Sequence, residues 1–152
     1  MHPLFERADA LSGRAIGAAI DVHRALGSGL LESIYERCLV HELESLRCKV
    51  ANQREVFVRY KDLTFTETLR FDVLVDDCLL IEIKAVEHLL PVHKAQLMSY
   101  MKLMDIPVGL LINFHESILK QGIVRLVLPG SNTPNQTAVN ETFDAVDSSP
   151  LR

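Results

Sequence analysis

A strand-like apolar segment interrupted by two charges constrains this chain more than any other feature. Residues 79–86 read LLIEIKAV. Because residues i and i+2 of a strand point the same way, Glu82 and Lys84 share one face and the aliphatic residues share the other. A second acid in a similar apolar setting, Asp72, lies ten residues earlier. Two carboxylates and an ammonium in buried surroundings require compensation, which a bound divalent cation and a substrate anion would supply.

Length and composition predict one folded domain. The chain has 152 residues, of which 48% are hydrophobic, and a net charge of −4. No apolar run approaches the ~18 residues of a membrane span, and the first residues lack the pattern of a secretory signal. The acidic balance argues against a protein that coats nucleic acid by bulk charge. Three cysteines without a CxxC pair favour reduced thiols and a cytoplasmic location.

Local charge between residues 47 and 61 departs from this balance. Five basic residues fall in this stretch with only two acids: Arg47, Lys49, Arg54, Arg59 and Lys61. They fit a solvated strand edge and a phosphate-contacting patch equally well.

Hydrophobic spacing predicts an α/β protein. Helices are expected at 8–26, 30–46 and 91–104, the first with an apolar face formed by Ile16, Ile20, His23 and Leu26. Strands are expected at 56–60, 65–75, 78–86, 108–114 and 123–128. The first three strands should form an antiparallel meander, and a right-handed helical crossover should make the third and fourth parallel neighbours. The composition after residue 128 predicts a single domain over 1–128 and a disordered tail over 129–152.

The turn between the two acid-bearing strands decides whether the acids meet. A two-residue loop of Asp76 and Asp77 would direct the acids to opposite sides of the sheet. A three-residue loop that includes Cys78 would set Asp72 directly opposite Glu82, with Cβ atoms about 5 Å apart. A bulge could have the same effect. The hypothesis of a shared site therefore requires the three-residue loop or a bulge.

Residues on two predicted helices could extend this site. Glu32 falls inside the apolar arc of the second helix, whereas Glu36 falls just outside it. Glu32 could equally be a first-turn acid favoured by the helix dipole. Gln96 and Tyr100 are four residues apart and share a flank of the third helix, which could also be an ordinary boundary between core and solvent.

These groups suit the hydrolysis of a phosphodiester. Asp72 and Glu82 would hold Mg²⁺ or Mn²⁺, helped by the Ile83 carbonyl and by Glu32 directly or through water. Lys84 would orient or deprotonate the attacking water and stabilise developing negative charge. Clustered acids without a metal should raise the pKa of at least one of them. The alternative is a half-exposed sheet on which Glu82 and Lys84 form a charge pair.

At these residues the chain resembles a known family. Residues 29–35 read GLLESIY and match the GxxExxY signature that names a family of small bacterial and archaeal proteins. The resemblance spans roughly residues 10–128 and continues through further motifs at 70–72, 82–87, 95–100 and 109–114. It implies the PD-(D/E)XK nuclease-like superfamily, with a restriction-endonuclease-like αβββαβ core, a mixed central sheet flanked by helices, and a metal site on the sheet.

The resemblance also implies roles for individual residues. Asp72 corresponds to the motif aspartate, and Glu82 to Lys84 form the (D/E)XK element. Phe71 stands where the superfamily name has proline.

Two further positions follow from the same resemblance. Residues 96–100 match the QxxxY motif of RecB-type nucleases, which implies that Gln96 and Tyr100 lie beside the substrate. Glu32 matches the first-helix acid that often completes the metal site.

The sequence thus supports two functional hypotheses. The first is a Mg²⁺- or Mn²⁺-dependent nuclease that acts on DNA, with RNA less favoured, and that works as a homodimer or with a partner protein. The alternative is a non-catalytic nucleic-acid- or protein-binding regulatory module on a nuclease-like scaffold. Both differ from a plain α/β domain whose charged residues form a solvated face.

Overall fold

The computed structural model of the chain describes residues 1–134. Its elements, in chain order, are α1 (Phe5–Leu26), α2 (Glu32–Ser45), β1 (Val50–Tyr60), β2 (Leu63–Val75), β3 (Leu79–Lys84), α3 (Pro91–Met104), β4 (Val108–Asn113), the 3₁₀ turn η1 (Leu119–Gly122) and β5 (Ile123–Val127).

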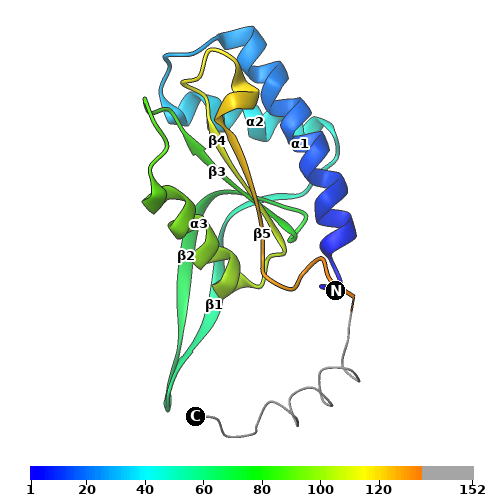
Figure 1. The fold of residues 1–152 in the computed structure, drawn as a ribbon, viewed down its shortest axis with the longest axis vertical. Helices are drawn as coiled ribbons and strands as arrows, with labels where there is room; N and C mark the ends of the chain where they lie inside the picture. The colour runs from blue at the N-terminus through cyan, green and yellow to red at the C-terminus, as the bar shows by residue number, and fades with distance from the viewer. Residues whose placement is uncertain (135–152) are drawn as a thin grey trace, which may run out of the picture.

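The strands form one mixed sheet in the order β1-β2-β3-β4-β5. Neighbouring strands are antiparallel except β3 and β4, which are parallel and joined by α3. Helices α1 and α2 cover one face of the sheet, and α3 covers the other (Figure 1). This arrangement confirms the predicted α/β class, the meander, the parallel crossover and the αβββαβ core.

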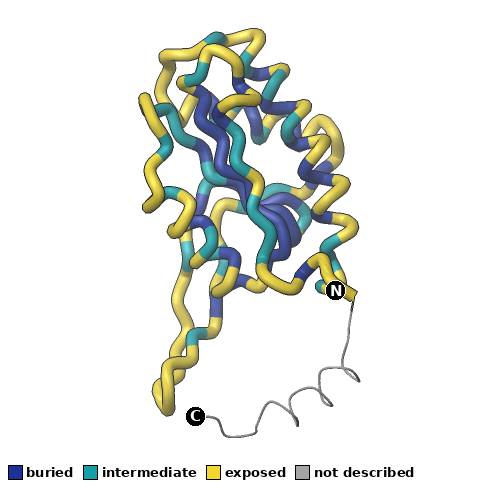
Figure 2. The backbone as a smooth tube through the Cα atoms, viewed as in Figure 1, coloured by how far each residue is buried: buried dark blue, intermediate teal, exposed yellow. Residues whose placement is uncertain are grey.

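The core has two apolar layers because successive strand residues face opposite sides of the sheet. Leu79, Ile81 and Ile83 of β3 pack beneath α1 and α2, whereas Leu80 packs beneath α3. Gly109 on β4 allows α3 to approach closely, since a Cβ there would lie 2.6 Å from the Met101 sulfur. Figure 2 shows the buried segments concentrated in the central strands.

Element boundaries agree with the sequence-based expectations in the centre of the chain and differ near its start. Helix α3 has the predicted bounds. Helix α1 begins at Phe5, three residues earlier than expected, and β1 begins at Val50, six residues earlier than expected. Lys61 and Asp62 alone connect β1 to β2, where a longer turn was predicted.

The predicted apolar face of α1 is wrong. The buried residues of this helix are mostly small: Ala8, Leu11, Ser12, Ala15, Ala18, Ala19 and Val22. Ile16 and Ile20 only flank that face, and Leu26 is exposed. Alanines bring a helix axis close to a sheet, so the helix packs through its small residues and leaves its larger ones at the margin.

Tyr35 fixes the connection between α1 and α2. Its buried hydroxyl donates a hydrogen bond to the Gly27 carbonyl at 2.6 Å and accepts one from the Leu30 N–H at 3.1 Å. Gly29, with φ +98°, supplies the left-handed backbone that the connection needs. The Tyr35 ring stacks on Phe114 with 4.5 Å between centroids. The first turn of α2 is therefore held against the residue that follows β4.

The described part of the predicted tail forms a turn against the N-terminus. The Ser131 carbonyl accepts a hydrogen bond from the His2 N–H at 2.9 Å, and the Leu128 N–H donates to the Pro107 carbonyl. Residues 135–152 lie outside the described residues, so the division at residue 128 stays a prediction. Across residues 1–134, every helix is too short or too polar to cross a membrane.

Replacing Tyr35 with phenylalanine should destabilise the fold. The substitution removes two hydrogen bonds and keeps the stacked ring, so the free energy of unfolding should fall by about 1–2 kcal/mol. Urea denaturation measures this change. Tyr60→Phe is the matched control because Tyr60 is exposed, and it should change stability by less than about 0.5 kcal/mol. Equal effects of the two substitutions would contradict the role assigned to the Tyr35 hydroxyl.

Candidate metal-dependent active site

Strands β2 and β3 stop pairing at the two acids singled out from the sequence. Their paired residues run from Val75 opposite Leu79 to Val73 opposite Ile81. The connection is therefore the three-residue loop 76–78, as the hypothesis of a shared site requires. One step further in the same register, Asp72 stands opposite Glu82.

A bulge in β2 coincides with this point. Ala51 of β1 faces Leu74, but the next paired residue, Gln53, faces Arg70. One residue of β1 thus stands against three of β2, 71–73. A bulge bends the strand and increases its twist, which ends regular pairing locally. Asp72 is the middle residue of this bulge.

The two carboxylates accept hydrogen bonds from backbone N–H groups at the point where β2 and β3 no longer pair with each other. The Asp72 N–H donates to Glu82 Oε1 at 3.4 Å, and the Ile83 N–H donates to Asp72 Oδ2 at 2.7 Å. Each carboxylate therefore reaches across to the other strand. The two acids converge on the gap between β2 and β3 and do not point to opposite sides of the sheet.

The Ile83 carbonyl faces the same gap. In a strand, the N–H and C=O of one residue point to the same side, and successive residues alternate. The Ile83 N–H points to Asp72, whereas the Lys84 carbonyl accepts a hydrogen bond from the Phe114 N–H on the β4 side. Two carboxylates and one carbonyl oxygen are therefore directed at one place.

The electrostatics of this cluster show that its charges are poorly compensated. Burial, followed by the charge of Asp72, raises the pKa of Glu82 to about 7, while a hydrogen bond from the Asp72 backbone and the Lys84 ammonium act in the opposite direction. Burial and then the charge and hydrogen bond of Asp72 raise the pKa of Glu36 to about 7, with a further contribution from Glu32. The cluster therefore holds protons near neutral pH.

Glu36 is the acid that the sequence analysis missed. It is half-buried on α2, and it lines a cavity of about 260 Å³ together with Val40, Glu44, Val50, Ala51, Asn52 and Asp72. Helical spacing placed Glu36 just outside the apolar arc, which is where a side chain at the margin of a core can turn inward. Its position four residues after Glu32 was the available signal, because such residues share a helix face.

Glu32 lies at the rim of the cluster. It is exposed, and its Oε1 accepts a hydrogen bond from the Ala85 N–H at 3.3 Å, just beyond the end of β3. Its side chain projects from the first residue of α2. Helical spacing set Glu32 inside the apolar arc and Glu36 just outside it, whereas in the structure Glu32 is exposed and Glu36 is half-buried. Glu32 nevertheless lies close to the end of the strand that bears Glu82 and Lys84.

Asn113 anchors the chain that follows Lys84. Its fully buried amide accepts a hydrogen bond from the Val86 N–H at 3.0 Å and donates one to the Val86 carbonyl at 2.8 Å. This pair of bonds fixes the exit of β3 to the end of β4. The backbone that carries Lys84 is thus held at both ends.

The two residues of the QxxxY motif occupy different environments on α3. Gln96 is exposed, and Tyr100 packs at the margin of the core layer beneath α3. Among the described residues, neither side chain forms a hydrogen bond with the acids. Phe71, at the position of the motif proline, is buried in the same apolar layer and so has a packing role.

The five basic residues between 47 and 61 do not form one patch. Lys49 lies 3.7 Å from Asp77, between their charged atoms. Arg54 and Arg59 differ by an odd number of positions in a stretch of β1 with uninterrupted pairing, so they lie on opposite faces of the sheet. These basic residues are therefore separate charges, and Arg54 among them is half-buried.

The donor chemistry of the cluster fits a hard divalent cation. No three His, Cys, Asp or Glu side chains within residues 1–134 are already arranged around one point as metal ligands. The oxygens of Asp72 and Glu82 and the Ile83 carbonyl are nevertheless the ligand types that Mg²⁺ and Mn²⁺ select. A cation would also offset the burial and the charge repulsion that together raise the pKa values of Glu36 and Glu82.

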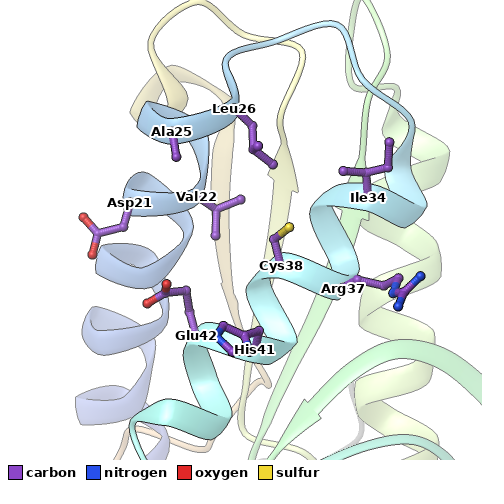
Figure 3. Close-up of a pocket in the computed structure, with 9 residues that line it drawn as sticks. All are labelled: Asp21, Val22, Ala25, Leu26, Ile34, Arg37, Cys38, His41 and Glu42. Carbon is purple, nitrogen blue, oxygen red and sulfur yellow. The ribbon is translucent and has the colours of Figure 1, made fainter.

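A separate cavity of about 620 Å³ lies between α1 and α2, away from these acids (Figure 3). Its lining comes from both helices: Asp21, Val22, Ala25, Leu26, Ile34, Arg37, Cys38, His41 and Glu42. It shares no residue with the cluster formed by Asp72 and Glu82, and the bond network described above does not reach it. The cavity beside Glu36 is the one that belongs to the site.

The raised pKa values predict a pH-dependent stability for the metal-free protein. Between about pH 4.5 and 7 the folded chain holds protons on Glu36 and Glu82 that the unfolded chain has released. The free energy of unfolding should therefore fall by roughly 1–3 kcal/mol as pH rises through this window. Urea denaturation in chelator over a pH series measures the fall.

Glu82→Gln should reduce this fall, whereas Glu67→Gln, on an exposed part of β2, should leave it unchanged. A stability that stays flat across the window in the unmodified protein would contradict the assigned pKa values.

A family model described as PD-(D/E)XK nuclease superfamily matches residues 9–126. No curated protein matches the chain. Among solved structures, the crystal structure of SSO0001 is similar with 22% identity and a TM-score of 0.45; the similarity covers 78% of this chain and 59% of that one. The chain thus spans about three-fifths of that protein's length. Because the family match extends over most of its residues, the chain belongs to the PD-(D/E)XK nuclease superfamily.

Proposed function

We propose that this protein is a Mg²⁺- or Mn²⁺-dependent nuclease of the GxxExxY type that hydrolyses phosphodiester bonds in DNA. The observation that carries the proposal is the convergence of the Asp72 and Glu82 carboxylates on the gap between β2 and β3. Membership of the PD-(D/E)XK nuclease superfamily supports nucleic acid as the substrate. The free cysteines Cys38, Cys48 and Cys78 fit a reducing, cytoplasmic setting.

The proposed ligands are Asp72, Glu82 and the Ile83 carbonyl, completed by Glu36 or Glu32 directly or through water. When bound, the cation would polarise a phosphate oxygen and lower the pKa of a coordinated water. Glu82, whose pKa is raised to about 7, must lose its proton before it can act as a ligand, so binding should be weaker below about pH 7.

Lys84 is the proposed positive group of the reaction. It is half-buried, and its ammonium lowers the pKa of Glu82, which places its charge near the cluster. From there it can orient the attacking water and stabilise the negative charge that develops on the phosphate. Gln96 and Tyr100, on α3, are proposed to contact the substrate strand and not the ion.

One observation favours the non-catalytic alternative. Asp72 and Glu82 already accept hydrogen bonds from backbone N–H groups, so the described arrangement is satisfied without an ion. A binding module could retain these bonds as structure alone. The nuclease proposal is preferred because these bonds only partly offset burial and the charge of Asp72, which raise the pKa of Glu82 to about 7. A bound cation would supply the remaining compensation.

Substitution of Lys84 should abolish cleavage and preserve the fold. In an assay with single- and double-stranded DNA and RNA, and with Mg²⁺ or Mn²⁺, Lys84→Ala should lose at least about 100-fold in rate. Lys49→Ala is the matched control, since Lys49 is exposed and its ammonium lies 3.7 Å from the Asp77 carboxylate in the loop 76–78. Unchanged cleavage by Lys84→Ala would reject the mechanism, and no cleavage by the unmodified protein under any condition would favour the binding module.

Metal should stabilise the protein, and the effect should depend on the cluster. At pH values above 7, saturating Mn²⁺ should raise the free energy of unfolding by roughly 1–3 kcal/mol, because the ion binds the folded state only. Glu82→Gln and Asp72→Asn should remove most of this gain, and Glu67→Gln should retain it. Thermal or urea unfolding with and without chelator measures the difference. A gain that persists in both cluster variants would place the ion elsewhere.

A further inference from the structure

The outer part of the β1–β2 hairpin projects beyond the helices that cover the rest of the sheet (Figures 1 and 2). Phe57 and Tyr60 are each 62% exposed, and Leu63 and Phe65 are also exposed. A two-stranded ribbon exposed on both faces is only marginally stable alone. Val56 and Val58 pack in the layer beneath α3, but the large apolar side chains nearer the turn are left uncovered among the described residues.

The outer side of β1 is one of two free edges of this hairpin, because β2 pairs with β3 only from Val73 to Val75. The sheet order places β1 at one end, so within residues 1–134 no strand pairs with its outer side. Tyr60 and Leu63 flank the two-residue turn, and such residues exchange both backbone hydrogen bonds. Because the direction alternates along a strand, the N–H and C=O groups of Glu55, Phe57 and Arg59 point to the open edge.

The sequence of this edge is complementary to itself when reversed. Residues 54–60 read REVFVRY. An antiparallel copy centred on Phe57 would set Glu55 opposite Arg59, Val56 opposite Val58 and Arg54 opposite Tyr60. Every outward-pointing backbone group would then meet another outward-pointing group, because residues opposite each other have the same parity.

We propose that the protein forms a two-fold symmetric homodimer through antiparallel pairing of β1 with β1 of a second copy, centred on Phe57. The two sheets then continue through the interface as one. Phe57 faces its own equivalent, and an acid–base pair flanks it on each side, with all these side chains on one face of the sheet. The seven paired residues extend over about 23 Å.

Charge selects this register over its neighbours. Centring the pair on Glu55 or on Arg59 would set like charges directly opposite each other, which is destabilising. Centring it on Val56 would set Glu55 opposite Phe57 and leave no opposite-charge pair between outward-pointing residues. Centring it on Val58 would set Glu55 opposite Lys61, a residue of the turn. The register centred on Phe57 pairs both charged residues of the ladder.

Arg54 supplies a second observation. Its Nη1 atom is buried and has no hydrogen-bond partner among the described residues. In the proposed dimer, Arg54 stands opposite Tyr60 of the second copy, on the face of the hairpin toward α3. A guanidinium beside a tyrosine ring gains a cation–π contact and can reach the phenol oxygen. Pairing would thus offer this side chain a partner that the single chain does not provide.

A charge-swap series tests the proposal by molecular mass. Sedimentation velocity over a concentration series should show a monomer–dimer equilibrium for the full chain. Glu55→Arg and Arg59→Glu should each shift the dissociation constant upward by at least about 10-fold, because each sets like charges opposite each other twice. The double variant Glu55→Arg/Arg59→Glu should recover dimerisation, since it restores opposite charges in the same register.

Glu67→Arg is the matched control: it makes the same charge change on β2, one strand away from the proposed contact between the two β1 strands, and should leave the dissociation constant unchanged. Circular dichroism confirms that each variant is folded. A monomer at every concentration, a dimer insensitive to both single reversals, or a folded double variant that stays monomeric would each overturn the proposal. The readout involves neither metal nor substrate, so its failure would leave the nuclease proposal intact.

Discussion

The structure depends on the way two adjacent carboxylates are accommodated where a sheet divides. Asp72 and Glu82 stand opposite each other at the point where β2 bulges away from β3. Placing like charges so close in half-buried surroundings is unfavourable by several kcal/mol unless protons, donors or cations intervene. Backbone N–H groups freed by the broken ladder supply part of the compensation. The raised pKa of Glu82 shows that this part is incomplete, which leaves room for a cation.

The elements around the gap between β2 and β3 fix the positions of the segments that carry the acids. Tyr35 fixes the first turn of α2 through hydrogen bonds to the preceding loop and a stacking contact with Phe114. The same stretch of chain, one residue earlier at Asn113, ties down the segment after β3. The end of β4 is thus the common support for the helix that brings Glu36 and for the strand that brings Glu82.

The sequence predicted those features that local patterns determine. The bounds of α3 and the parallel crossover followed from apolar periodicity. The pattern left both a two-residue and a three-residue loop open after β2, and only the hypothesis of a shared site required the loop 76–78 that the structure has. Glu36 could not be chosen over Glu32 in this way, because the choice depends on where the helix begins relative to the sheet beneath it. The alanine face of α1 was missed for a similar reason: spacing shows which residues align, whereas close packing decides which of two aligned faces turns inward.

The bulge at residues 71–73 also separates the two parts of β2, one that forms the projecting hairpin with β1 and one that pairs with β3 beside the site. On the turn side of the bulge, β1 and β2 pair without interruption and present a free, self-complementary edge. On the other side, β2 pairs with β3 and carries Asp72 to the site. The bulged residues 71–73 can accommodate changes in the bend and twist of β2. An interaction at the edge of the hairpin could therefore set the orientation of the hairpin while Val73 stays paired with Ile81. A dimer built on β1 would accordingly place two acid clusters in a fixed two-fold relation while leaving the local geometry of each unchanged.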